Sequence, residues 1–207
     1  MSYDQFSNRI TNANYEYDSA GNQTRGQAPN GTFQRFQYDA AGRLVKVMDN
    51  SYNELESYAY GASRQRLRTI SGSLTTYYAW GGSSVLCEYT ETTGNSGTFK
   101  FSKSYVYAGS RLLSTQVWNG TAEVTEFHHP DRLGTKLVTN NAANTFYEQS
   151  TLPFGTSLDA EFIGTPTTNQ RFTSYDRSTM AGLDYAVNRS YSSGQGRFTS
   201  VDPIGFG

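Results

Sequence analysis

The stretch that decides the fold is YEYDSAGNQTRG at residues 15–26, which FQYDAAGRLVKV at residues 36–47 repeats 21 positions later. Each copy has two aromatic residues separated by one position, then an aspartate, and then a glycine three positions after the aspartate. Because strand side chains alternate between faces, the two rings lie on one face of a strand. An aspartate and a glycine at this spacing favour a type I turn in a hairpin loop, where the carboxylate accepts backbone N–H groups and the glycine takes positive φ.

The same unit recurs four more times, as YAYGASRQRLRTI, YAWGGSSVLCEY, YVYAGSRLLSTQV and FHHPDRLGTKLVT at residues 58–70, 78–89, 105–117 and 127–139. The second aromatic position of the six units falls at 17, 38, 60, 80, 107 and 129, so the intervals are 21, 22, 20, 27 and 22 residues. Spacing of this kind predicts a repeat array in which each unit is one β-hairpin. An ordinary β-sandwich is the alternative, but it does not require the same turn at the same offset.

Two sets of residues are predicted to build the repeats. The predicted turn residues are Asp18, Gly21, Asp39, Gly42, Asp131 and Gly134. The predicted strand aromatics are Tyr15, Tyr17, Tyr38, Tyr58, Tyr60, Tyr78, Trp80, Tyr105 and Tyr107. Gly61, Gly81 and Ala108 stand where the aspartate is expected, so we expect those turns to close without a carboxylate cap.

The composition agrees with a β protein and excludes several function classes. Sixteen Tyr, twelve Phe and twenty Gly in 207 residues are typical of β structure. Seventeen basic and eighteen acidic residues give a net charge near zero, so the chain lacks the excess of positive charge that is typical of nucleic-acid-binding proteins. No apolar run is long enough for a membrane-spanning helix and the first residues do not resemble a secretion signal, so we expect no membrane insertion and an export signal outside this chain. The single Cys87 predicts no internal disulfide and is expected to be a small apolar strand residue.

The sequence shows no pattern typical of a metal or cofactor site. His128, His129 and Asp131 are close in sequence, but neighbouring residues on a strand point to opposite faces, so we expect turn residues rather than ligands. No nucleophile, histidine and carboxylate are arranged as a triad, and no phosphate-binding glycine loop follows a strand and opens a helix. We therefore predict that no cofactor is bound.

The motifs carry a resemblance to a known family. YDSAGN and YDAAGRLVKV resemble the tyrosine-aspartate (YD) repeats of Rhs proteins, which include bacterial polymorphic toxins and insecticidal toxin complexes and have relatives in teneurins. HHPDRLGTKLVTN at 128–140 and LPFGTSL at 152–158 resemble the segments that follow the repeats in that family. Residues 171–205, RFTSYDRSTMAGLDYAVNRSYSSGQGRFTSVDPIG, resemble the Rhs-associated core, with one helical turn expected over 178–183. On this resemblance, residues 1–140 are hairpin repeats and residues 141–207 are a core segment that ends at DPIG.

The resemblance implies a fold and a set of partners. Family repeats form a β-spiral that closes into a hollow shell around a C-terminal toxic polypeptide. The implied partners are therefore the rest of the parent protein and its toxin, outside or on the surface of a bacterium. Because 207 residues are too few for the closed shell, we expect an all-β chain of successive antiparallel hairpins, forming a curved β-spiral sheet or partial barrel with a small irregular C-terminal segment. Its unpaired edges predict either self-association of an open sheet or local closure around that segment.

Two other functions are considered beside the structural one. The family core cleaves itself by aspartyl chemistry, which implies Asp202 as one carboxylate. Arg197 is expected to support it, because its guanidinium can hold a nearby carboxylate ionised. The second Asp-Pro-x-Gly of the family is missing, and a lone carboxylate lacks the partner that such chemistry needs, so enzyme activity is uncertain and a turn-ordering role for Asp202 is favoured in this chain. Asn188, Arg189 and Ser190 also depart from the family pattern.

The third possibility is carbohydrate binding, in which exposed tyrosines stack on sugar rings. It ranks below the structural role because aromatic strand pairs more often stabilise the sheet itself.

Overall fold

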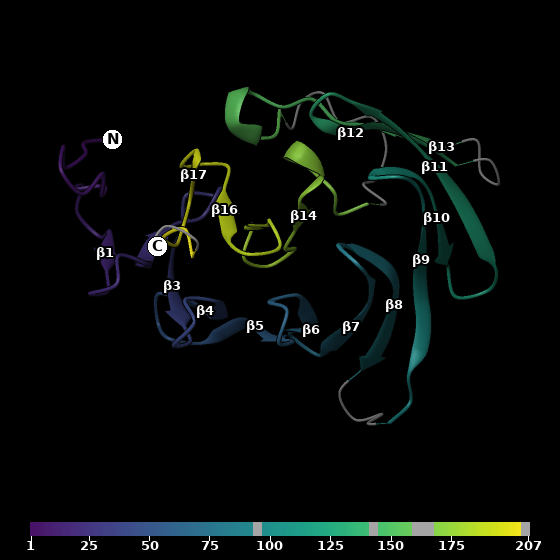
Figure 1. Cartoon of the computed structure of the whole chain (residues 1–207), viewed down its shortest axis with the longest axis horizontal. Helices are drawn as coiled ribbons and strands as arrows, with labels where there is room; N and C mark the ends of the chain where they lie inside the picture. Colours follow the sequence, from purple (N-terminus) through teal and green to yellow (C-terminus); the bar gives the residue numbers. More distant parts are fainter. Residues whose placement is uncertain (93–96, 141–144, 159–167, 204–207) are drawn as a thin grey trace.

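The computed structural model describes residues 1–92, 97–140, 145–158 and 168–203. Thirteen strands form one antiparallel sheet in which neighbours in sequence are neighbours in space. Their bounds are β1 Glu16–Tyr17, β2 Gln23–Gln27, β3 Phe33–Tyr38, β4 Leu44–Asp49, β5 Glu54–Tyr60, β6 Arg66–Ser71, β7 Leu74–Gly81, β8 Ser84–Thr92, β9 Lys100–Ala108, β10 Arg111–Trp118, β11 Glu123–Asp131, β12 Gly134–Asn140 and β13 Thr145–Glu148. The sheet curves through an arc and is not closed, since its order starts at β1 and ends at β13 (Figure 1). The predicted all-β fold of successive hairpins is confirmed.

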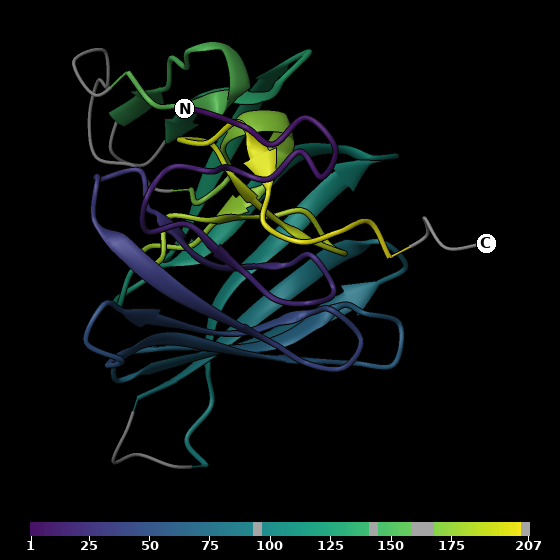
Figure 2. The same cartoon turned by 90° about the vertical axis from the view of Figure 1, so that its left-hand side faces the viewer.

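A second, smaller sheet lies in the concavity of the first (Figures 1 and 2). It is a four-stranded antiparallel meander of β14 Asp176–Arg177, β15 Asp184–Tyr185, β16 Ser190–Ser192 and β17 Arg197–Phe198. Two short 3-10 turns, η1 Pro153–Gly155 and η3 Phe172–Ser174, come before it in the chain. We call residues 168–203, which contain this sheet, the inner segment.

The helical turn expected over 178–183 is a tight loop between β14 and β15. The N–H of Gly182 donates to the carbonyl of Ser178 at 3.2 Å, and the N–H of Ser178 donates to the carbonyl of Leu183 at 2.8 Å. Gly182 has φ 68, a left-handed conformation that stops a right-handed helix from continuing. The loop is therefore closed after one turn, and no residue of it is α-helical.

The first hairpins are closed by a five-residue turn built around an aspartate. Asp39 Oδ1 accepts the N–H groups of Ala41 at 2.9 Å and Arg43 at 3.0 Å, and Gly42 has φ 70. Asp18 and Gly21 repeat this arrangement, with Gly21 at φ 92 and its N–H 3.1 Å from the Asp18 carbonyl. In β11 and β12, Asp131 pairs with Gly134, and its Oδ1 accepts the Leu133 N–H at 2.7 Å.

Sequence reasoning missed a further copy of this turn, at residues 49–53. Asp49 Oδ1 accepts the N–H groups of Ser51 at 2.8 Å and Asn53 at 2.9 Å. The motif was hidden because Tyr52, rather than glycine, takes the left-handed conformation, with φ 67.

The turns without an aspartate close by backbone geometry. In the turn after Tyr60 the N–H of Gly61 donates to the Gln65 carbonyl at 2.9 Å. Later hairpins use two-residue loops that begin with a glycine in the left-handed conformation, at Gly72, Gly82 and Gly109, with φ of 58, 61 and 63. Such loops suit the twist of paired strands and need no carboxylate cap.

A bulge follows the turn in successive hairpins and helps to curve the sheet. Tyr60 pairs with Arg66 and Ala59 with Arg68, which leaves Leu67 as the extra residue. Leu86 and Leu113 hold the same place in their hairpins. All three leucines are at least 40% exposed, so they lie on the convex face. A bulge bends its strand and increases the local twist, and the repetition of this bulge favours an arc over a flat sheet.

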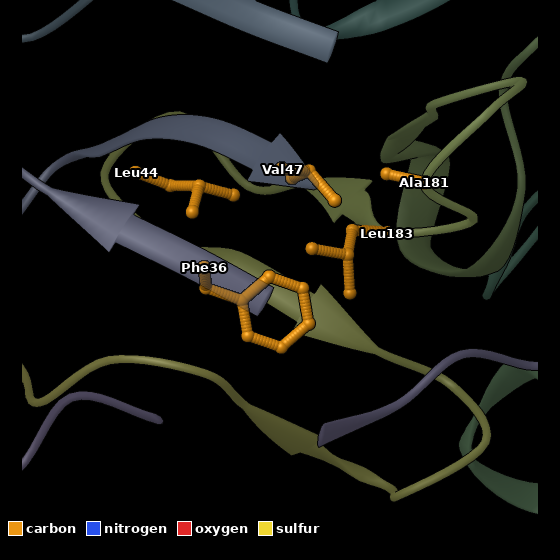
Figure 3. Close-up of a cluster of buried hydrophobic side chains, with 5 residues drawn as sticks. All are labelled: Phe36, Leu44, Val47, Ala181 and Leu183. Atoms are coloured by element: carbon orange, nitrogen blue, oxygen red, sulfur yellow. The ribbon is translucent and has the colours of Figure 1, made fainter. Parts of the chain in front are cut away.

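The main apolar contact between the two sheets lies near the start of the chain. Phe36, Leu44 and Val47 of the large sheet pack against Ala181 and Leu183 of the inner segment, and all five are at most 4% exposed (Figure 3). Tyr38, Leu55 and Tyr58 border this cluster. Farther along the arc, the contacts between the sheets are mainly polar and aromatic.

Candidate functional site on the concave face

The aromatic pairs of the central repeats lie on the concave face and contact the inner segment. Tyr60 and Trp80 approach Tyr185 with ring centroids 6.4 and 6.5 Å apart. Toward the start of the chain, the Tyr38 hydroxyl donates to the Thr199 carbonyl at 3.2 Å. Tyr15 lies outside β1 and packs edge-on against Phe33. The rings thus stabilise the contact between the sheets as well as each hairpin.

Arg66 is the buried cation of this face. Its guanidinium is 2.6 Å from Asp176 Oδ2 and lies over the rings of Tyr78 at 4.8 Å and Tyr185 at 4.2 Å. The backbone takes part too, since the Arg66 N–H donates to the Tyr185 hydroxyl at 2.8 Å and Trp80 Nε1 donates to the Arg66 carbonyl at 2.8 Å. Burial raises the pKa of Tyr78, so its hydroxyl stays protonated. Arg66 therefore joins β6 and β7 of the large sheet to the inner segment.

Glu56 is a buried carboxylate held by neutral donors. It is 1% exposed and accepts hydrogen bonds from the hydroxyls of Tyr58 at 2.5 Å, Ser71 at 3.1 Å and Ser178 at 2.5 Å. The N–H of Met180 adds a bond at 3.3 Å. Burial, and after it the charge of Glu56, raises the pKa of Tyr58 and keeps that donor protonated. The carboxylate thereby fixes the loop of residues 178–180 to β5.

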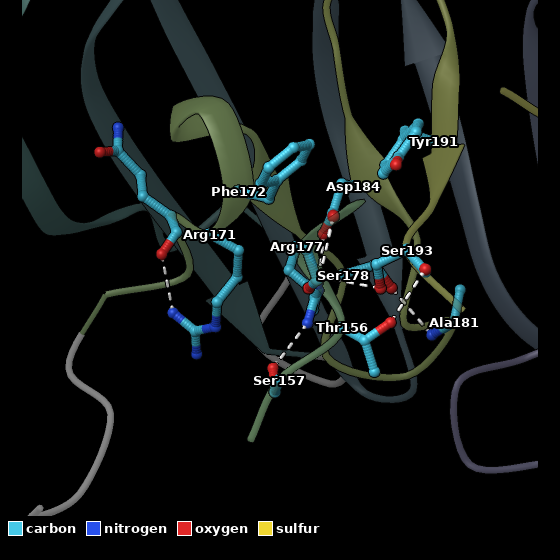
Figure 4. Close-up of polar contacts among 12 residues, drawn as sticks. Thr156, Ser157, Arg171, Phe172, Arg177, Ser178, Ala181, Asp184, Tyr191 and Ser193 are labelled. Carbon is cyan, nitrogen blue, oxygen red and sulfur yellow. Dashed lines mark hydrogen bonds and ion pairs between the residues drawn. The ribbon is translucent and has the colours of Figure 1, made fainter. Parts of the chain in front are cut away.

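Within the inner segment, Arg177 and Asp184 form a buried ion pair (Figure 4). Asp184 is 0% exposed, and its two oxygens accept from Arg177 at 2.6 and 2.9 Å. Arg177 also donates to the Gly155 carbonyl at 3.1 Å and to the hydroxyls of Ser157 and Ser193, both at 3.0 Å. Burial raises the pKa of Asp184, while the bonds from Arg177 act in the opposite direction. This pair ties the segment around η1 to the small sheet.

The structure places Asp202 beside Arg189, not beside Arg197. Asp202 Oδ2 is 3.1 Å from Arg189 Nη2, and the Asp202 side chain is 52% exposed. Arg189 in turn lies over the Phe198 ring at 3.8 Å. Arg197 donates to the Asn8 carbonyl at 2.7 Å and lies over the Tyr3 ring. Sequence reasoning missed Arg189 because it stands in a stretch that departs from the family pattern.

The two histidines lie on opposite faces of β11. His128 is 5% exposed with Nε2 3.1 Å from Thr115 Oγ1, whereas His129 is exposed with Nε2 3.1 Å from Thr139 Oγ1. Burial lowers the pKa of His128 to about 4, with smaller contributions from Lys103 and His129. Among the residues that the structure describes, no three His, Cys, Asp or Glu side chains are grouped closely enough to hold a metal ion. Cys87 lies in β8 as a half-buried free thiol.

Comparison with known proteins agrees with this geometry. The family model RHS Repeat matches residues 17–51, which contain the turns at Asp18 and Asp39. Residues 17–51 are therefore similar to that repeat family. The curated tRNA3(Ser)-specific nuclease WapA of Bacillus spizizenii is 27% identical over 203 residues, which are 95% of this chain and 8% of WapA. The chain thus spans less than a tenth of that relative.

Solved structures share the fold of this chain. A Tc holotoxin pore of Photorhabdus luminescens with a mutated TccC3 superposes with a TM-score of 0.69 at 18% identity, covering 91% of this chain and 9% of the other. A TcdB2-TccC3-Cdc42 crystal structure gives 0.67 at 19% identity, with 91% and 10% covered. In the described part of this chain, no helix has the length and apolar character needed to cross a membrane.

Proposed function

We propose that this chain is a section of the wall of an Rhs shell that encloses a C-terminal toxin outside the bacterial cell. The observation that carries the proposal is the open hairpin sheet whose concave face holds polar and aromatic groups and already covers a polypeptide segment, the inner segment. The similarity to WapA and to TccC3-containing assemblies supports it. In this proposal residues 1–140 are wall and residues 141–207 are the core segment, of which β13 adds the edge strand to the wall and the inner segment lies against its concave face.

The sheet edges fit a section of a longer wall. Among the described strands, β1 pairs only with β2 and β13 only with β12, so each has one side on which a further strand could add. We propose that repeats of the parent protein continue the sheet at these edges. Pairing with a second copy of this chain is the alternative when the chain is alone.

Protease protection in the full-length parent protein tests the wall proposal. Thr76 of β7 pairs with Thr69 on one side and Thr90 on the other, so Thr76→Pro breaks the middle of the sheet. We expect the C-terminal polypeptide to resist added protease in the native protein and to become cleavable in the Thr76→Pro variant. Thr98→Pro, in the loop before β9, is the matched control and should leave the protection intact. Enclosure would be contradicted if added protease cleaved the C-terminal polypeptide of the native protein as fast as that of the Thr76→Pro variant.

Self-cleavage through Asp202 is the second candidate function. Its support is that Arg189 pairs with Asp202, because a guanidinium favours the ionised carboxylate that one member of an aspartyl pair must be. In the full-length parent protein, Asp202→Asn should abolish release of the C-terminal polypeptide, as seen by denaturing gel electrophoresis. Asp131→Asn, at an exposed turn, should release it normally. Unchanged release in Asp202→Asn would exclude this role for Asp202.

A further inference from the structure

A cavity of about 190 Å³ lies between the concave face of the wall and the inner segment. A space of about 150 Å³ holds a benzene ring, so this one fits a single ring or one long side chain. The shell role does not require a space of this kind. Six aromatic rings line it, those of Tyr78, Trp80, Tyr105, Tyr107, Tyr175 and Tyr185.

The charges around the cavity leave one carboxylate without a cation. Asp176 and Arg66 neutralise each other at 2.6 Å. Glu88 accepts a hydrogen bond from the Tyr105 hydroxyl, and no cation of the described chain lies within salt-bridge distance of it. Lys103 faces Glu88 across β8 and β9, but its ammonium lies over the Tyr105 ring, 5.7 Å from the centroid. The cavity wall therefore carries a net negative charge at Glu88.

Aromatic faces beside an unneutralised carboxylate form the combination that binds organic cations in proteins. The wall already holds one such group, because Arg66 lies 4.2 Å from the centroid of Tyr185 and 4.8 Å from that of Tyr78. We propose that the cavity binds one organic cation of side-chain size, a guanidinium or an alkylammonium, with Glu88 as its counter-ion and Trp80 and Tyr107 as ring contacts. The cation could belong to a basic side chain of a polypeptide or to a free small molecule.

Calorimetric titration of the 207-residue chain tests the charge requirement. The probes are N-acetyl-arginine methylamide for a polypeptide source and choline for a free cation, with N-acetyl-citrulline methylamide as the neutral isostere of the first. We expect saturable one-to-one binding of at least one cation, roughly tenfold or more tighter than citrulline. Tighter binding of the arginine probe favours a polypeptide source, and tighter binding of choline a free one. Binding of neither cation more tightly than the citrulline probe, or no saturable binding of either cation, would overturn the proposal.

Two variants locate the site. Glu88→Gln keeps an acceptor for Tyr105 but removes the charge, and should weaken cation binding by roughly tenfold. Glu91→Gln is the matched control, since Glu91 also lies on β8 and accepts a tyrosine hydroxyl, from Tyr77 at 2.8 Å, outside the cavity. Tyr107→Leu keeps every charge and should weaken binding severalfold, which gives a second measurement if Glu88→Gln does not fold. Unchanged affinity in folded Glu88→Gln, or in Tyr107→Leu, would contradict the assignment. Failure here leaves the wall proposal standing, because protection of the toxin does not depend on this cavity.

Discussion

Replacing Arg177 with methionine is expected to lower the free energy of unfolding by about 3–5 kcal/mol at pH 7. The change leaves the carboxylate of Asp184, which is 0% exposed, without its only ion-pair partner in the described chain. It also removes the donors to Gly155, Ser157 and Ser193. Urea unfolding, together with hydrogen exchange of the amides in β14–β17, measures the effect.

The loss in Arg177→Met should depend on pH, and its sign follows from Asp184. Burial raises the pKa of this carboxyl above its ordinary value of 3.8, and the variant lacks the bonds from Arg177 that oppose the rise. A carboxyl whose pKa is raised in the folded state takes up a proton on folding, so the stability of the variant falls as pH rises through and above 3.8. The deficit relative to the native chain should therefore be smaller near pH 4 than at pH 7.

A second substitution separates charge from packing in this pair. Adding Asp184→Asn to Arg177→Met removes the unpaired charge, so the double variant should be more stable at pH 7 than Arg177→Met alone. It should also lose most of the pH dependence. A double variant less stable than the single one would show that the ion pair is not the source of the effect.

Replacing Phe36 with alanine is expected to cost about 3–5 kcal/mol, the usual range for removing a buried phenylalanine. Phe36 is 4% exposed and belongs to the apolar cluster that joins the wall to Ala181 and Leu183 of the inner segment (Figure 3). Because this cluster is the main apolar contact that the described residues make with the loop between β14 and β15, we expect that loop to become sensitive to protease along with the loss of stability.

Phe127→Ala is the matched control for Phe36→Ala. Phe127 lies in β11 on the convex face and is 43% exposed, so its removal should change the free energy of unfolding by less than about 1 kcal/mol. Similar losses in the two variants would mean that the cluster around Phe36 does not hold the inner segment.

The sequence by itself determined the succession of hairpins. The spacing of the aromatic pairs, the β-rich segments after each turn and the Asp-x-x-Gly turns are local signals, because a turn is closed by residues within five positions of one another. For the same reason Gly61, Gly81 and Ala108 could be read as turns that close without a carboxylate. The turn at Asp49 does not match the pattern because Tyr52 stands in place of the glycine and no aromatic pair precedes the aspartate.

Only the tertiary structure decided how the C-terminal third meets the wall. Arg66 and Asp176 are separated by 110 residues, and Glu56 and Ser178 by 122, and no periodicity within a repeat links such positions. Arg197 was expected to support Asp202 because of its charge and its closeness in sequence, whereas the fold brings Arg189 to Asp202. The geometry of a turn depends on residues that are neighbours in sequence. The pairing of buried charges depends instead on how the curved sheet brings distant segments together, which is a property of the whole chain.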